Sequence, residues 1–217
     1  MKERFDLLIF DWDGTLVDSI DWIVQCVQTA AKLCDCAIPE PQAAKDIIGL
    51  SIQAAINTLF PDEDAATQQR LVTHYGELFF SKQTTADDLF HGVEEMLQQL
   101  KNAGYQLAVA TGKNRAGLDK VLAGTGMADF FVMTRCADET ASKPHPLMLE
   151  QIMQHTGIAP ERTLMIGDSI HDLQMAKNAG IASIGVTCGA HSAETLQPYQ
   201  PLQCLAHPTE LLALILG

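Results

Sequence analysis

The feature that most constrains this chain is a short apolar run that leads directly into two acidic residues. Residues 5–10 read FDLLIF, and Asp11, Trp12, Asp13 and Gly14 follow. Apolar side chains without polar alternation are typical of a strand buried on both faces of a parallel sheet. Two carboxylates at its end must be solvated, paired or bound to a metal, because burying them bare is prohibitive. Since ligands bind beyond the carboxyl ends of strands in open α/β sheets, the acids predict a functional site there.

Two other interpretations of this acidic segment require no active site. Aspartate and glycine are ordinary turn residues, so solvated acids at a strand end would have the same sequence. A calcium-binding loop of the EF-hand type needs glycine at its sixth position and glutamate at its twelfth. Counted from Asp11, the glycine falls at position four and Trp22 at position twelve, so the spacing excludes that loop.

Beyond residue 89, strand-like and helix-like patterns alternate along the chain. The amphipathic helical patterns cover residues 93–103, 114–123, 146–156, 171–179 and 209–216. The strand-like apolar runs cover residues 106–110, 130–133, 163–166, 181–186 and 202–205. This order, with glycine or proline between elements, predicts an α/β fold with a parallel sheet and helices on both of its faces.

Residues 17–84 interrupt this alternation. Apolar residues recur at helical spacing over 19–35, 41–48, 51–60 and 64–80, and no convincing strand lies among them. We therefore expect an all-helical cap domain over residues 17–84, inserted after the first strand. The α/β core domain would consist of residues 1–16 and 85–217, and the cap would lie where it can cover the site.

Charge and cysteine content limit the partners of the chain. The net charge of −13 over 217 residues argues against nucleic acid or an anionic membrane as a partner, although a metal ion and local lysines still permit a phosphate substrate. The six cysteines are scattered without zinc or redox spacing, which indicates reduced thiols and a cytoplasmic protein. The first apolar stretch is too short for a signal peptide, and no window reaches membrane-span length. A monomer and a homodimer are both compatible with the sequence.

A hydroxyl and a lysine also follow predicted strands. Thr111 precedes Gly112, Lys113 and Asn114 at a helix start, which is typical of a phosphate site but equally of a plain helix N-cap. Lys143 stands in a short rigid loop and would bring a positive charge to the same edge, although most lysines are simply exposed.

A second apolar strand pattern also ends in an acid. Asp168 follows Gly167, and Asp172 comes four residues later in the first turn of the next predicted helix. Acids also stabilise helix N-termini, but capping does not explain why two strands both end in carboxylates. Together these residues would gather oxygen ligands, one hydroxyl and one lysine at one edge of the sheet. Such hard oxygen ligands favour Mg²⁺.

These segments resemble the four motifs of the haloacid dehalogenase-like hydrolase superfamily. The matching residues are, in order, Asp11-x-Asp13-Gly14-Thr15, Thr111, Lys143 and Gly167-Asp168-x3-Asp172. The resemblance covers essentially the whole chain, and the helical insertion resembles the cap of the phosphoglycolate phosphatase and beta-phosphoglucomutase branch. It implies a Rossmann-like core and a Mg²⁺-dependent phosphatase that acts on a small phosphorylated metabolite.

The resemblance also implies roles for the matching residues. Asp11 would be the nucleophile that forms an aspartyl-phosphate, and Asp13 would act as general acid and then as general base. Mg²⁺ would be held by Asp11, the backbone carbonyl of Asp13 and Asp168, and Asp172 would support or complete its ligand shell. Thr111 and Lys143 would stabilise the transferring phosphoryl group. The residues in contact with substrate would be Gly14, Thr111, Gly112, Lys113 and Lys143.

Within this family the sequence favours a phosphatase over a sugar phosphomutase, and a pyrophosphatase stays open. Mutases of this kind carry a basic residue soon after the first cap glycine, whereas residues 49–53 read GLSIQ here. Lys45 or Arg70 could still reach the site from elsewhere in the cap. A dehalogenase would lack Asp13, and a catalytically inactive binding protein would have lost Asp11 or Asp13, so both are disfavoured.

Overall fold

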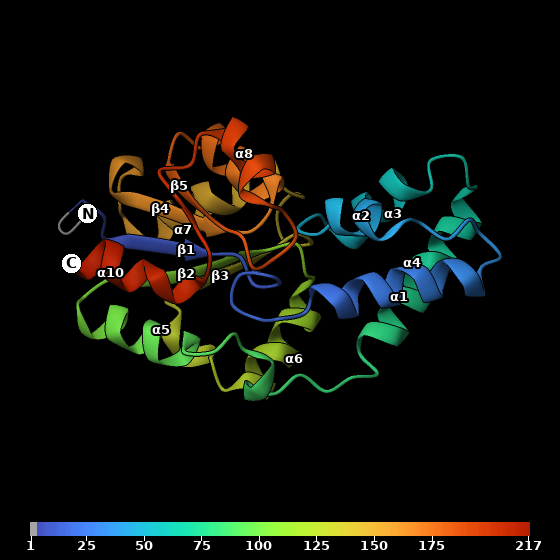
Figure 1. The fold of residues 1–217 in the computed structure, drawn as a ribbon, viewed down its shortest axis with the longest axis horizontal. Coiled ribbons are helices and arrows are strands. Elements are labelled where there is room, and N and C mark those ends of the chain that lie inside the picture. Colours follow the sequence, from blue (N-terminus) through green and yellow to red (C-terminus); the bar gives the residue numbers. More distant parts are fainter. Residues whose placement is uncertain (1–3) are drawn as a thin grey trace.

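The core of the molecule is one parallel sheet. The computed structural model describes residues 4–217, so residues 1–3 of the predicted core domain lie outside the described part. The strands run in the order β3-β2-β1-β4-β5-β6, and every pair is parallel (Figure 1). Their bounds are β1 Leu7–Phe10, β2 Gln106–Thr111, β3 Met133–Cys136, β4 Thr163–Gly167, β5 Ala182–Val186 and β6 Cys204–Leu205.

Helices cover both faces of the sheet, as the sequence predicts. Leu8 and Phe10 of β1 pack with α5, α6 and α10, whereas Leu7 and Ile9 pack with α7 and α8 on the other face. All four side chains are fully buried, because successive residues of a strand point to opposite faces. The helix bounds are α5 Val93–Asn102, α6 Arg115–Thr125, α7 Leu147–Thr156, α8 Ile170–Asn178, α9 Ala193–Leu196 and α10 Leu211–Leu216.

Four helices form a helical lobe between β1 and α5. They are α1 Ile20–Leu33, α2 Pro41–Asp46, α3 Ile52–Leu59 and α4 Ala65–Phe79. Figure 1 shows this lobe beyond the carboxyl end of β1. Its apolar side chains form clusters of their own, and Ser51 and Asp64 cap α3 and α4 by accepting hydrogen bonds from backbone N–H groups. The assignment of residues 17–84 to a separate domain stays a prediction.

The sequence prediction is wrong about one strand, and it misplaces the start of β6 and the start of α10. Residues 130–133 were expected to form a strand, but β3 begins at Met133 and residues 128–130 form a short 3₁₀ helix. Phe130 and Phe131 lie at the end of this 3₁₀ helix and pack against the core, which explains the apolar run, whereas β3 is an edge strand that tolerates polar residues. β6 is shorter than the predicted 202–205, and α10 starts at Leu211 after a 3₁₀ turn. Within residues 4–217, no helix combines the length and apolar character that a membrane crossing requires.

Candidate active site

The sheet order explains why distant acids meet. Phe10 of β1 pairs with Val109 of β2 on one side and with Ile166 of β4 on the other. The backbone N–H of Asp11 continues this pairing by donating to the carbonyl of Ile166 (2.9 Å). The carboxyl ends of the three central strands therefore lie at one edge of the sheet. Thr111 is the last residue of β2, and Asp11 and Asp168 directly follow β1 and β4 at that edge.

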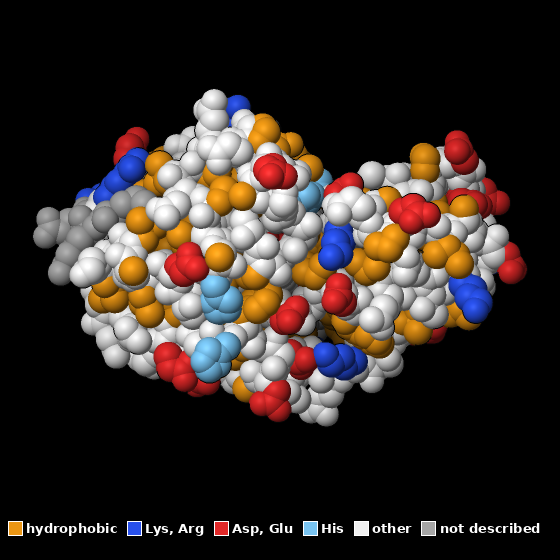
Figure 2. All heavy atoms as spheres, viewed as in Figure 1, with side chains coloured by type: hydrophobic (Ala, Val, Ile, Leu, Met, Phe, Trp, Pro, Cys, Tyr) orange, Lys and Arg blue, Asp and Glu red, His pale blue; other side chains and the backbone are white. Residues whose placement is uncertain are grey.

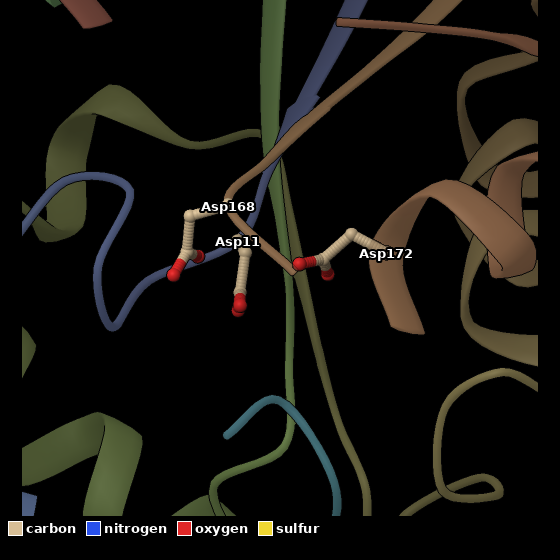
Figure 3. A group of neighbouring side chains, drawn as sticks. All are labelled: Asp11, Asp168 and Asp172. Carbon is tan, nitrogen blue, oxygen red and sulfur yellow. The ribbon is translucent and has the colours of Figure 1, made fainter. Parts of the chain in front are cut away.

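Three carboxylates converge at this edge. Asp11, Asp168 and Asp172 each offer an oxygen within 4.8 Å of the others, and all three are buried. Figure 3 shows Asp11 and Asp168 side by side beyond their strands, with Asp172 pointing toward them from α8. The carboxyl groups predicted to hold a metal from β1, β4 and α8 are thus brought together by the fold.

Lys143 joins this carboxylate cluster. Its Nζ lies 2.8 Å from Oδ1 of Asp11 and 2.6 Å from Oδ1 of Asp172, and the side chain is 1% exposed. Burial by itself would lower the pKa of Lys143, but the two neighbouring carboxylates outweigh it and raise the pKa above its ordinary value. A fully buried lysine that keeps its charge therefore stands between Asp11 and Asp172.

The cluster contains more negative charge than Lys143 can balance. Burial raises the pKa of Asp11 well above its ordinary range, and the charge of Asp172 adds to the rise. Burial and Asp172 likewise raise the pKa of Asp168 to about 7. When all three carboxyl groups are ionised, they exceed the single ammonium group by two negative charges, and their oxygens are the donors that hard divalent cations prefer. The residues present therefore fit a divalent cation.

Two of the acids are fixed by further hydrogen bonds. Asp168 accepts from the hydroxyl of Thr15 (2.9 Å) and from the backbone N–H of Ala190 (2.8 Å). Asp172 accepts from both the N–H and the hydroxyl of Ser169, and Ser169 is the N-cap of α8. The capping interpretation thus holds for Asp172, which caps its helix with one oxygen and binds Lys143 with the other. Asp168 takes no part in the cap.

Asp13 stands apart from the carboxylate cluster. Its Oδ1 accepts a hydrogen bond from the hydroxyl of Ser19 (2.7 Å), and its Oδ2 lies 2.8 Å from Nζ of Lys113. The ammonium group of Lys113 also lies over the ring of Phe79, 4.2 Å from its centre. The structure does not bring the Asp13 side chain among the carboxylates of the predicted metal site; the backbone carbonyl of Asp13 was the ligand expected there.

The loop after β2 is not a plain helix cap formed by Thr111. The N-cap of α6 is Asn114, whose side chain accepts from the N–H of Gly117 (2.8 Å). Thr111 is buried and accepts a hydrogen bond from the N–H of Lys113 (3.2 Å), and it lines the same cavity as Asp11. Gly112 lies beneath the helical lobe, where a Cβ atom would collide with the carbonyls of the loop after α2.

Gly14 has two reasons to be glycine. Its φ of +73° lies in the left-handed region, which side chains rarely adopt. A Cβ atom there would also collide with the carboxylate of Asp168. Gly14, which was predicted to contact substrate, therefore allows the loop after β1 to pack directly against the carboxylate of Asp168.

A cavity of about 160 Å³ lies between this edge of the sheet and the helical lobe. Asp11, Asp13, Thr111, Gly112 and Lys113 line it from the sheet side. Figure 2 shows the surface indented where the helical lobe meets the core. Residues of the α/β core and residues of the helical lobe therefore both line the cavity.

The sequence analysis missed several residues of this site. Ser19 holds Asp13, Thr15 holds Asp168, and Tyr75 and Phe79 line the cavity from α4. Thr15 lies inside a motif that the sequence analysis quoted, so its proximity to the acids could have been expected. Tyr75 and Phe79 lie four residues apart on one helix face, a pattern that equally fits ordinary core packing.

Comparison with known proteins decides the family. The family model described as haloacid dehalogenase-like hydrolase matches residues 8–186. The chain belongs to this family. Over 200 residues it is 38% identical to a probable phosphatase IndB from Dickeya dadantii, across 90% of this chain and 86% of the relative. It is 32% identical over 212 residues to a phosphoglycolate phosphatase from Vibrio vulnificus, across 92% and 91% of the two chains.

The fold agrees with this family. A crystal structure described as a putative haloacid dehalogenase-like hydrolase from Bacteroides fragilis superposes with a TM-score of 0.86 at 25% identity, covering 96% of this chain and all of the other. The predictions of a Rossmann-like α/β core and of a phosphoric monoester hydrolase of this family are thereby confirmed.

Proposed function

We propose that this phosphatase hydrolyses small phosphate monoesters with the help of Mg²⁺, through a phosphoryl group carried transiently on Asp11. One observation carries the proposal. Asp11 lies in a buried carboxylate cluster against Lys143, while the second acid, Asp13, stands apart in the same cavity. A nucleophile and a separate proton donor are what a two-step hydrolysis through an enzyme ester requires.

The two oxygens of Asp11 have different surroundings. Oδ1 lies 2.8 Å from the ammonium group of Lys143 and accepts a hydrogen bond from the N–H of Trp12 (2.7 Å). Oδ2 accepts no hydrogen bond from the described residues, and Asp11 lines the cavity. This arrangement fixes the carboxylate and leaves one oxygen available to attack phosphorus.

Two displacements at phosphorus make up the proposed reaction. In the first, an oxygen of Asp11 bonds to phosphorus, the ester P–O bond breaks, and Asp13 gives its proton to the departing alkoxide. In the second, Asp13 takes a proton from water, the water oxygen bonds to phosphorus, and the bond between Asp11 and phosphorus breaks. The products are an alcohol and inorganic phosphate, and both acids return to their first state.

The remaining residues position and neutralise the phosphoryl group. Asp11, Asp168 and Asp172 provide the carboxylates around a cation, and the backbone carbonyl of Asp13 is proposed as a further ligand. Bound Mg²⁺ would neutralise negative charge on the phosphoryl oxygens and on the nucleophile. Thr111 and the N–H groups after it are proposed to hold the transferring oxygens, and Lys143 would offset their charge.

The cavity gives no support to the mutase or pyrophosphatase alternatives. Both reactions bring a second phosphate group into the cavity, and a cation on the lobe side would neutralise its charge. Lys45 lies 3.9 Å from Asp21, and Arg70 donates to the carbonyl of Cys34, so neither lines the cavity. A simple phosphatase therefore agrees best with the observed contacts.

Replacing the nucleophile tests the proposal. Asp11→Asn should reduce hydrolysis of p-nitrophenyl phosphate by ~10⁴-fold or more, because an amide oxygen cannot form the enzyme ester. Asp18→Asn is the matched control, since Asp18 is exposed seven residues further along the chain. Circular dichroism and urea unfolding would verify that both variants fold. Undiminished turnover by Asp11→Asn would refute the assigned nucleophile.

Metal removal tests the cofactor separately. EDTA should abolish the activity, and Mg²⁺ added in excess should restore it. Full activity in EDTA would refute the metal assignment but leave the nucleophile open, because the two experiments probe different groups.

A further inference from the structure

The two walls of the cavity differ sharply in chemistry. Every charged group that lines it comes from the sheet side: Asp11, Asp13 and Lys113. From the helical lobe, the lining residues are apolar or glycine with one exception, Tyr75. The phosphoryl group belongs at the charged wall, beside the proposed nucleophile. The rest of the substrate must therefore face the apolar one.

The cations of the lobe are all engaged or exposed elsewhere. Lys45 and Arg70 are held by Asp21 and by a backbone carbonyl, and Lys82 lies 2.6 Å from Asp88. Lys32 is exposed at the far end of α1. Among residues 4–217, Lys113 is the one cation that lines the cavity, and it is paired with Asp13. Among the described residues that line the cavity from the lobe, no side chain has a positive charge that could neutralise a second anionic group.

We infer that the substrate is a phosphate monoester whose alcohol part is uncharged and mostly apolar. The inference rests on the proposed function and narrows it. It disfavours phosphoglycolate, which has a carboxylate on its alcohol part, and it disfavours sugar bisphosphates and pyrophosphate for the same reason.

Desolvation decides against a second charge. Moving a carboxylate from water to an apolar wall without a cation costs several kcal/mol, whereas apolar surface gains about 25 cal/mol per Å² buried. The cavity of about 160 Å³ must hold the phosphoryl group as well as the part of the alcohol that contacts the apolar wall.

Tyr75 provides the single polar contact on the lobe side. Its ring stacks on Phe79 with centroids 5.7 Å apart, which fixes its orientation on α4. Its hydroxyl has no hydrogen-bond partner among the described residues. Burial, and then the charge of Asp13, raise the pKa of this phenol well above its usual value, so it stays neutral and can donate. A neutral hydroxyl or carbonyl on the substrate is the group it fits.

Two matched esters test the inference directly. The wild-type enzyme with Mg²⁺ would be assayed on 4-methylphenyl phosphate and 4-carboxyphenyl phosphate, which differ in one substituent of similar size. The carboxylate makes the phenol a better leaving group, so chemistry alone favours the second ester. We expect kcat/KM for 4-carboxyphenyl phosphate to be at least ~100-fold lower than for 4-methylphenyl phosphate, because the carboxylate would be buried without a cation.

A charge-swapped variant provides the reciprocal test. Val72 lines the cavity one turn before Tyr75 on α4, so Val72→Lys would place a cation on the apolar wall. Relative to the matched variant Val72→Met, we expect it to raise the ratio of kcat/KM for 4-carboxyphenyl over 4-methylphenyl phosphate by ~10-fold or more. Tyr75→Phe should lower the ratio for 4-hydroxymethylphenyl over 4-methylphenyl phosphate by about 3- to 10-fold.

The outcomes separate the inference from the proposed function. Equal kcat/KM for the methyl and carboxyl esters, with turnover that depends on Asp11, would overturn the inference and leave the phosphatase mechanism standing. The inference would also be overturned if Val72→Lys left the carboxyl-to-methyl ratio of kcat/KM unchanged and Tyr75→Phe left the hydroxymethyl-to-methyl ratio unchanged. Absence of Asp11-dependent hydrolysis of any of these esters would overturn both.

Discussion

The two sides of the cavity divide the work of the enzyme differently. On the sheet side, each charged group has partners that fix its position: Lys143 lies between Asp11 and Asp172, and Thr15 holds Asp168. On the lobe side, apolar residues and Tyr75 form a wall that holds few polar atoms. Under the proposed function, the sheet edge would provide the chemistry, whereas the lobe would select which alcohol accompanies the phosphate.

The largest effect on stability and activity is expected when the lysine between the buried carboxylates of the sheet side is removed. Lys143→Met removes the cation that lies 2.8 Å from Asp11 and 2.6 Å from Asp172, so both carboxylates lose their buried partner. The free energy of unfolding should fall by about 3 kcal/mol or more, and hydrolysis by at least ~100-fold. Urea unfolding in EDTA and p-nitrophenyl phosphate assays measure the two effects.

The control for this variant is Lys177→Met. Lys177 is exposed in the last turn of α8, so the same substitution there should change the free energy of unfolding by less than about 0.5 kcal/mol. Equal behaviour of the two variants would contradict a central role for Lys143.

The burial of Asp168, together with the charge of Asp172, predicts an unusual pH dependence of stability without metal. The pKa of Asp168 is raised from 3.8 to about 7, so between these values the folded protein binds more protons than the unfolded chain. The free energy of unfolding should therefore fall as pH rises, by about 2 kcal/mol between pH 5 and pH 7 for this group alone. Excess Mg²⁺ should flatten the decline, because a bound cation stabilises the ionised form.

Urea unfolding in EDTA at pH 5, 6 and 7 would measure this effect. Asp168→Asn is the comparison, because the amide does not titrate and that variant should lose the contribution of Asp168 to the slope. Identical slopes for the two proteins would mean that Asp168 ionises normally in the folded state.

The smallest effects come from one substitution made on each side of the cavity. At Gly76 of α4 no atom lies within 4 Å of an added Cβ, so Gly76→Ala should raise the free energy of unfolding by about 0.5–1 kcal/mol. Gly14→Ala should instead lower it by about 1–3 kcal/mol, because a Cβ there is strained and meets Asp168. Thermal or urea unfolding of both variants checks the opposite signs, and equal signs would contradict the described contacts.

The sheet side could be predicted from the sequence because its parts depend on local patterns. Apolar runs identify β1 and β4, and the carboxyl ends of parallel strands meet at one edge, so the proximity of Asp11 and Asp168 follows. The dual role of Asp172, helix cap and partner of Lys143, could not be separated from capping alone, because both give the same residue at the same place.

The lobe side could not be predicted, for a physical reason. Helical spacing in α4 shows that one face is apolar, but Tyr75 and Phe79 fit the interior of the lobe as well as a cavity wall. Which of them faces the sheet depends on how two separately packed clusters meet, and no local pattern records this. The error at residues 130–133 has a related origin, since an aromatic pair packed on the core resembles a buried strand.

The order of the strands has a consequence for the newly made chain. β1 is translated first, yet it lies at the centre of the sheet and needs β4, more than 150 residues downstream, as a neighbour. Until residue 166 has left the ribosome, Asp11 lacks the carbonyl that its backbone N–H binds, as well as most of its carboxylate neighbours. The carboxylate cluster can therefore form only late in synthesis, and a prematurely terminated chain would contain Asp11, the proposed nucleophile, without the residues that surround it in the fold.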